Sequence, residues 1–407
     1  MNRRVELKCL FLIVVVLISA CVETDIYLPA FPDMMAAFSA SEGAIQGLLT
    51  WNFVGICVSG PLYGPISDSF GRKKPLMVAL GIFLLGSVIA LFARNLDQML
   101  WGRILQGLGS GGCFTLGTAI LFDVFQKDKA IDALNKLNMI IPIIMSVAPM
   151  LGGYLNYTYG FRSNFLVIAI FVLVSFAISL FFFDETHARE KRAPFQAPAI
   201  LRDFKQVFSN LAFWQITLVI SLSFAGYIAF LSGTAVLFVV DLGMSKAVFP
   251  FVQAAILGAW VVAGLVINRA IAKWGALNVK KAGTALAVMG CLMIGLVAWI
   301  APQNPYLLTC GMLLDAFGAN WMIGLYFPEA MELLPHIKGV TASLATSARL
   351  LIAALVVGLT SALYDATIYP LAIVMIGTIV VILPTLVFYE KRRAQVLHKQ
   401  LGELEEN

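Results

Sequence analysis

Five ionisable side chains lie inside long apolar stretches of the sequence: Glu23, Asp25, Arg103, Asp315 and Arg349. A charge at the centre of a bilayer costs about 2.5–3.5 kcal/mol on insertion scales, so such residues need a partner or a polar cavity. A buried carboxyl beside an arginine can act as a proton switch, because desolvation favours the neutral acid and the arginine favours the carboxylate. The residue types therefore point to proton exchange within a membrane.

Asp25 is the main candidate for carrying the proton. It lies about 25 Å along a helix that starts near Lys8, in the outer third of a membrane span. Arg103 lies about 9 Å past Asp97 and so at a similar depth, and we expect Asp25 and Arg103 to pair. Glu23 lies on a different helix face and is a weaker candidate. A structural ion pair, an acid exposed at the helix end, or an arginine that snorkels outward are the alternatives.

Asp315 and Arg349 form a second candidate pair near the membrane midplane. Asp315 lies about 14 Å below the outer start of its span and Arg349 about 15 Å above the inner start of its own. Neither charge is stable there without a partner, so we expect the two to pair. Whether the pair binds substrate or fixes the packing stays open.

Several aromatic and polar residues could line a substrate cavity together with Glu23, Asp315 and Arg349. For each of them taken alone, packing is a simpler explanation than ligand contact. These candidates are Tyr27, Trp51, Asn52, Tyr227, Asn320, Trp321 and Tyr326.

The composition identifies the elements that must position these side chains. Of the 407 residues, 60% are hydrophobic and 13% charged, and the mean hydropathy is +0.88. Soluble domains average about half apolar and about a quarter charged residues. The apolar runs are long and continuous, unlike the alternating segments, about ten residues long, of a membrane β-barrel. The chain is therefore predicted to be an all-α membrane protein and not a soluble enzyme, a disulfide scaffold or a disordered chain.

Other chemistries lack their residue patterns. The cysteines are scattered and show no metal-ligand spacing, and no G-x-x-x-x-G-K-[ST] loop for ATP is present. A net charge of +5 is modest and does not indicate a nucleic-acid partner. We expect no enzymatic activity, catalytic residue, cofactor or metal site.

Each transmembrane helix needs about 20 apolar residues, and the sequence has twelve such segments. The predicted spans are Lys8–Met35, Ala44–Ser67, Pro75–Ala93, Gln98–Phe122, Ala133–Tyr154, Ser163–Phe183, Ala212–Val240, Phe249–Ile271, Val279–Ile300, Tyr306–Phe327, Gly339–Leu363 and Ile368–Tyr389.

The positive charges predict the orientation of these spans. Of the 28 lysines and arginines, 23 fall on the side that holds both termini, three fall on the other side and two lie within spans. Basic loops stay in the cytoplasm, so both termini are predicted to be cytoplasmic. The longest connection, Asp184–Leu211, separates a six-span unit over residues 1–184 from a second over 212–407. Within the linker 185–211, apolar residues at helical spacing predict an amphipathic helix.

The loop between spans 2 and 3 carries the pattern G-x-x-x-D-x-x-G-R-K-K, formed by Gly64, Asp68, Gly71, Arg72, Lys73 and Lys74. We expect Gly64 to allow close helix packing, Asp68 to cap a helix or pair with an arginine, and Gly71 to permit a tight turn. The pattern resembles the signature of the major facilitator superfamily, with Ser69 where that family usually has a basic residue. An ordinary basic loop is the alternative.

Three further motifs resemble the same superfamily. Arg103 and the glycines that follow it resemble the arginine motif linked there to proton coupling. Pro149, Gly152 and Gly153 resemble the end of its antiporter motif, although the glycine before the proline is an alanine here. The string T-D-I-Y-L-P-A-x-P, which includes Asp25 and Tyr27, resembles the Bcr/CflA subfamily of drug–proton antiporters.

This resemblance implies twelve helices in two six-helix bundles around a central cavity, the major facilitator fold. It implies a monomer in a bacterial inner membrane that exports amphipathic small molecules or drugs in exchange for protons. An exporter of one metabolite or siderophore, and a transporter-like sensor that moves nothing, are the alternatives.

Overall fold

The computed structural model describes residues 3–125, 144, 147–187, 197–334 and 337–405, and the regular secondary structure within them is helical. In these residues, 11 helices are long and apolar enough to cross a membrane. The prediction of an all-α membrane protein is confirmed. The fifth predicted span, Ala133–Tyr154, lies mostly outside the described residues, although residues 147–159 are helical. The count of twelve therefore stays a prediction.

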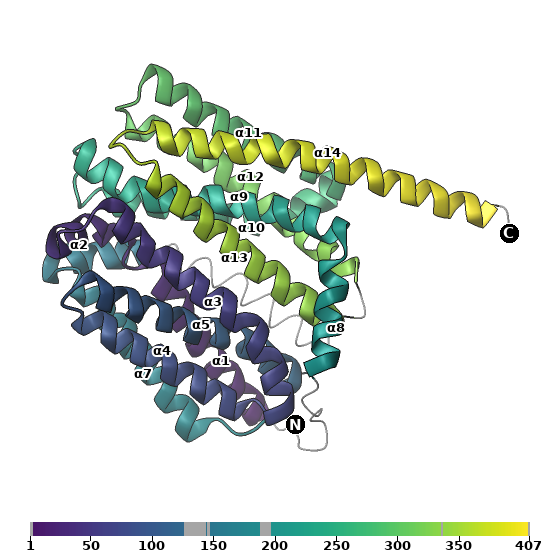
Figure 1. Cartoon of the computed structure of the whole chain (residues 1–407), viewed down its shortest axis with the longest axis horizontal. Coiled ribbons are helices and arrows are strands. Elements are labelled where there is room, and N and C mark those ends of the chain that lie inside the picture. Colours follow the sequence, from purple (N-terminus) through teal and green to yellow (C-terminus); the bar gives the residue numbers. More distant parts are fainter. Residues whose placement is uncertain (1–2, 126–143, 145–146, 188–196, 335–336, 406–407) are drawn as a thin grey trace.

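The elements before the linker form one group of helices, drawn in purple to teal in Figure 1. They are α1 (Arg3–Asp25), the 3₁₀ turn η1 (Leu28–Ala30), α2 (Phe31–Phe38), α3 (Glu42–Phe70), α4 (Lys73–Phe92), α5 (Leu96–Val124), the helix over 147–159 and α7 (Arg162–Phe182).

The later elements form a second group, drawn in teal to yellow in Figure 1. They are α8 (Ala197–Phe208), α9 (Leu211–Val236), the π-helical turn η3 (Leu237–Asp241), α10 (Phe249–Trp274), α11 (Ala276–Ile300), α12 (Pro305–Glu332), α13 (Lys338–Ala362) and α14 (Tyr369–Glu405). The linker helix α8 packs against α9 and α13.

Polar caps at the span starts explain where several helices begin. The side chains of Ser41, Asn95, Asn210 and Asn304 accept hydrogen bonds from free amides in the first turns of α3, α5, α9 and α12. Such a cap satisfies donors that the helix itself cannot. The predicted first span, in contrast, is divided into α1, η1 and α2. Pro29 and Pro32 lie in the first turns of η1 and α2, where a missing amide donor costs nothing.

The helices α3 and α13 lie side by side between the two groups (Figure 1). The Thr50 hydroxyl donates a hydrogen bond to the Ala354 carbonyl at 3.5 Å. The Ser347 hydroxyl donates to the Cys57 carbonyl at 3.0 Å. The two groups of helices therefore meet through small polar side chains on antiparallel helices.

Candidate transport site

Arg103 on α5 is fully buried and lies at the centre of a polar network. One terminal nitrogen, Nη1, donates to Glu23 Oε1 and, at 2.7 Å, to Gln106 Oε1. The other, Nη2, donates to the Tyr27 hydroxyl at 3.0 Å, and the guanidinium carbon lies 4.2 Å from the centre of the Tyr27 ring. Asn52 on α3 completes the network, donating to Glu23 Oε1 at 2.9 Å and to the Arg103 carbonyl at 3.1 Å.

The structure corrects the expected pairing of Asp25 with Arg103, because Glu23 is the carboxylate that binds the arginine. Glu23 and Asp25 do lie on different faces of α1, as expected, but the face toward α5 carries Glu23. Asp25 is the last residue of α1 and is 1% exposed. Its Oδ2 has no hydrogen-bond partner in the described part of the chain. Distance along the helix could not select between the two acids, because they are only two residues apart.

Asp25 is next to a tight crossing between the helix over 147–159 and the start of η1. A Cβ built on Gly152 would overlap the carbonyl oxygen of Ile26, and one built on Gly153 would overlap the Pro250 ring of α10. Only glycine fits at either position. The motif that resembles the antiporter signature therefore touches the chain directly after Asp25 and also the second group of helices.

Asp315 lies against α11 and not against Arg349, which corrects the second expected pair. The Cys291 thiol donates to Asp315 Oδ1 at 3.4 Å, and Asp315 Oδ2 has no partner among the described residues. The cause is the helix arrangement: α12 packs closely on α11 and only weakly on α13. Equal depth in the membrane does not bring together residues on helices that are poor neighbours.

Arg349 on α13 faces α9. Its guanidinium carbon lies 5.0 Å from the centre of the Phe224 ring. The Phe224 ring lies near the rings of Trp260 and Tyr227, with centres 6.3 Å and 6.4 Å away. Tyr227 and Trp260 are closest to each other, at 4.5 Å. The structure thus brings two of the candidates, Tyr227 and Arg349, into one cluster.

The remaining cavity candidates lie elsewhere. Trp321 is buried between α10 and α12, and its indole nitrogen donates to the Ala263 carbonyl at 3.0 Å. Asn320 lies beside Gly264 of α10. Trp51 on α3 is 47% exposed. None of these three has a described contact with the Arg103 network.

The loop between α3 and α4 is organised around Arg72. Its guanidinium donates to Asp123 Oδ2 of α5 at 2.6 Å and to Asp68 Oδ1 at 2.6 Å. Burial lowers the pKa of Arg72, but the hydrogen bonds and charges of Asp123 and Asp68 outweigh burial and raise it. The turn itself requires Gly71, whose φ is +87°.

Three details of this loop differ from expectation or were missed. The space beside Gly64 is open, so this glycine does not mediate a close helix contact here. Glu185 caps α4, accepting hydrogen bonds from the Arg72 amide at 2.7 Å and the Lys73 amide at 3.4 Å. Neither Asp123 nor Glu185 was predicted from the sequence, although an acid at the end of a predicted span was the available signal for Asp123.

At the opposite end of the molecule an ion pair joins the two groups of helices, and further polar contacts lie within each group. None of these contacts was predicted from the sequence. Lys246, between η3 and α10, pairs with Asp33 of α2. The Asn156 amide donates to the same carboxylate at 2.6 Å. At the end of η3, Asp241 Oδ2 accepts a hydrogen bond from the Tyr364 hydroxyl. Burial and the contact with Asp241 raise the pKa of Tyr364 well above its ordinary value.

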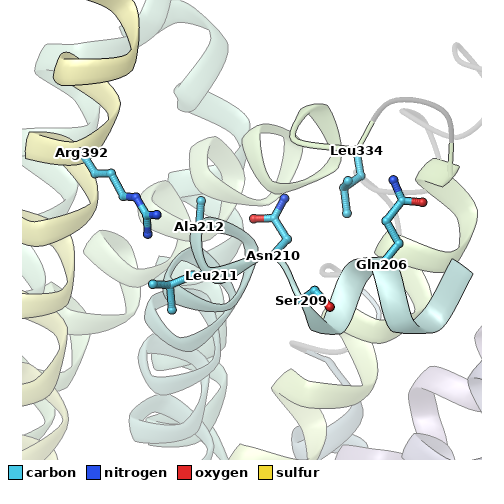
Figure 2. A pocket seen from close by; sticks show the side chains of 7 residues that line it. All are labelled: Gln206, Ser209, Asn210, Leu211, Ala212, Leu334 and Arg392. Carbon is cyan, nitrogen blue, oxygen red and sulfur yellow. The ribbon is translucent and has the colours of Figure 1, made fainter. Parts of the chain in front are cut away.

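A cavity of about 450 Å³ lies where α8 meets α9 (Figure 2). Arg392 of α14 and Leu334 border it from the two sides. This cavity contains no residue of the Arg103 network and none of the Arg349 cluster. It is lined by Gln206, Ser209, Asn210, Leu211, Ala212, Leu334 and Arg392.

Long apolar helices with buried ion pairs and motif loops at their ends define a multi-pass membrane transporter. The model of the Major Facilitator Superfamily matches residues 13–357, so the chain belongs to this family. The superfamily predicted from the sequence motifs is confirmed.

Known proteins agree with this assignment. The chain is 27% identical over 358 residues to multidrug resistance protein D of Escherichia coli K12, covering 84% of this chain and 86% of that protein. It is 24% identical over 365 residues to the bicyclomycin resistance protein homolog of Haemophilus influenzae, covering 88% and 89%. These names agree with the predicted Bcr/CflA-type subfamily.

Solved structures share the fold. The chain superposes with a TM-score of 0.68 on the xylose transporter XylE of Escherichia coli, at 15% identity, covering 93% of this chain and 96% of XylE. The TM-score is also 0.68 for a bacterial homolog of the lysosomal transporter Spinster, at 16% identity, covering 96% and 97%. The predicted major facilitator fold is therefore confirmed.

Proposed function

We propose that this protein exports amphipathic small molecules, drugs among them, across a bacterial inner membrane in exchange for protons. Membership of the superfamily and the resistance proteins among its relatives support export of drug-like molecules. One observation carries the proton coupling: Asp25 is buried, with a carboxyl oxygen that has no partner in the described chain, while Arg103 is already paired with Glu23.

The electrostatics assign different roles to the two acids. Glu23 is compensated by the charge of Arg103 in a buried ion pair. Asp25 has no such compensation, and an isolated carboxylate in a dry interior is strongly disfavoured, so burial keeps a proton on it. When the site opens to water, hydration stabilises the carboxylate and the proton can leave. Asp25 thereby gains or loses a proton as its access to water changes.

Alternating access provides that change. The two units, residues 1–184 and 212–407 joined by the linker 185–211, rock about the site near the membrane midplane. Both termini and the Arg72 loop face the cytoplasm, and the Asp33–Lys246 contact closes the periplasmic side. The protein acts as a monomer within the bilayer, with protons and a small molecule as its ligands. Substrate binding and proton release are linked, so each alters the affinity for the other.

Accumulation of ethidium by everted membrane vesicles under an imposed pH gradient tests the proposal. Asp25→Asn keeps the size of the side chain but cannot ionise, so it should abolish gradient-driven accumulation. Asp97→Asn, which changes an exposed acid at the start of α5, is the matched control and should accumulate ethidium normally. Wild-type accumulation by Asp25→Asn would exclude Asp25 as the coupling site.

A further inference from the structure

The guanidinium of Arg349 forms no salt bridge with any described carboxylate. Its Nε is buried without a hydrogen-bond partner, and Asp315, the acid at the same depth, contacts Cys291. The contact of Arg349 that is present is the face of the Phe224 ring, 5.0 Å away. A ring face attracts a cation but does not neutralise its charge. Arg349 therefore remains able to bind an anion.

The Phe224 ring beside this charge is packed against two further rings, those of Tyr227 and Trp260. We call Phe224, Tyr227, Trp260 and Arg349 the aryl–arginine cluster. The rings of Tyr227 and Trp260 are 4.5 Å apart at their centres and inclined by 34°. Phe224 meets Trp260 nearly edge-on, at 71°. Rings at such distances offer flat and edge surfaces on which a further aromatic ring can pack.

The cluster is accessible although it lies deep in the membrane. Arg349 and Trp260 are each about 17 Å from the starts of α13 and α10, and Phe224 is about 20 Å from the start of α9. All three side chains are partly exposed. A guanidinium facing lipid at this depth is strongly disfavoured. The exposed part of Arg349 is therefore expected to face the interior of the protein and not lipid.

The same cluster borders the proposed proton site. The Tyr227 hydroxyl is buried and has no hydrogen-bond partner in the described chain. It lies within electrostatic range of Asp25, and α9, which carries Tyr227, packs against η1 directly after Asp25. A molecule bound on Arg349 and the rings would lie next to the group that exchanges the proton.

We propose that the aryl–arginine cluster binds an aromatic substrate through its carboxylate, with Arg349 as the anion-binding group and the three rings as the packing surface. Two parallel N–H donors of arginine match the two oxygens of a carboxylate, and a guanidinium binds this group better than an ammonium does. Because the charge of Arg349 is otherwise uncompensated, the site should discriminate against the uncharged analogue of the same shape. This proposal rests on the proposed transport function and specifies one class of its substrates.

Binding of 2-naphthoate and 2-naphthamide to the purified full-length protein at fixed pH tests the proposal. The two probes share a ring system and differ in charge, and calorimetry measures both. We expect wild type to bind naphthoate about tenfold more tightly, the ratio of one charge-assisted contact. Arg349→Gln should remove this preference while leaving the affinity for naphthamide within about twofold. Arg349→Lys keeps the charge and should retain part of the preference.

Arg162→Gln is the matched control, because Arg162 also lies over a phenylalanine ring, at 5.4 Å from Phe161, but is at a helix start outside the cluster. It should keep the wild-type preference. Wild type that does not prefer naphthoate, including no binding of either probe, overturns the proposal. If Arg349→Gln does not fold, the comparison uses Arg349→Lys and Arg162→Gln. A naphthoate preference that is reduced in Arg349→Lys but not in Arg162→Gln supports the proposal. A preference that is unreduced in Arg349→Lys contradicts it.

The binding test and the vesicle test fail independently. Loss of the naphthoate preference with intact dependence of export on Asp25 removes only the anion subsite. Gradient-driven export by Asp25→Asn, with the naphthoate preference intact, removes only the proton-coupling role. The two results together therefore identify which part is wrong.

Discussion

At the residue scale, the Arg103 network shows what residue types and their spacing can and cannot predict. The sequence predicted that Asp25 of span 1 pairs with Arg103 of span 4, and the structure does pack these two helices, α1 and α5, against each other. It did not predict that Glu23 would be the partner. Glu23 and Asp25 are two positions apart, so they differ by about 3 Å along the helix axis but by about 200° in direction around it. The direction depends on how α1 rotates between α5 and α7, which is a property of the packed bundle.

Replacing Glu23 and Asp25 by their amides should therefore affect the yield of folded protein differently. Glu23→Gln leaves the Arg103 charge buried without compensation, a loss of about 3–5 kcal/mol for buried pairs. It should lower the yield of monodisperse protein on gel filtration, and adding Arg103→Gln should partly restore it. Asp25→Asn breaks no ion pair and should purify like wild type. The reverse order of yields would contradict the pairing.

Asp315 provides a second test of pairing. Because its described contact is the Cys291 thiol and not a base, Asp315→Asn should shift the thermal unfolding midpoint only slightly. Its effect should add to that of Arg349→Gln within about 0.3–0.5 kcal/mol, as expected for independent sites. Thermal unfolding of the two single variants and the double variant measures this. A coupling well above that range would restore the midplane pair expected from depth alone.

At the element scale, apolar length predicted where most spans lie, while local chemistry decided their ends. The predicted span Phe249–Ile271 extends to Trp274 in α10, and Tyr306–Phe327 extends to Glu332 in α12. The division of span 1 could have been predicted, because Pro29 and Pro32 have no backbone N–H and cannot donate the hydrogen bonds of a continuous helix. Which helices pack against each other, such as α12 against α11, could not be predicted, because no pattern in a single sequence indicates it.

The helix crossing at Gly152 gives a prediction at this scale. An alanine there would force the helix over 147–159 away from the Ile26 carbonyl, next to Asp25. Gly152→Ala should lower both the thermal midpoint and ethidium accumulation. Gly258→Ala is the matched control, since a Cβ at this position in α10 meets open space and alanine favours a helix by about 1 kcal/mol over glycine. Equal behaviour of the two variants would contradict a role for this crossing.

At the scale of the whole molecule, the asymmetry of the positive charges predicted that one end of the bundle is rich in basic residues and the other is poor in them. The Arg72 loop holds one end within the first group of helices through Asp68 and Asp123. At the other end, Asp33 of α2 pairs with Lys246, which lies between η3 and α10 in the second group. Sequence periodicity could not predict this pair, because it depends on how the two groups of helices meet.

The Asp33–Lys246 contact gives the last prediction. In the proposed transport cycle, the end of the molecule that this contact joins must open for substrate to leave. Asp33→Cys with Lys246→Cys, joined by a short bismaleimide linker, would hold the two groups together at this end. The background carries Cys310→Ser, since Cys310 is the exposed native thiol among the described residues. We expect the linked protein to lose ethidium accumulation in everted vesicles. Each single-cysteine variant, treated in the same way, should keep it, because modification of one thiol leaves the groups free to separate. Undiminished accumulation by fully linked protein would mean that export does not require this end of the molecule to open.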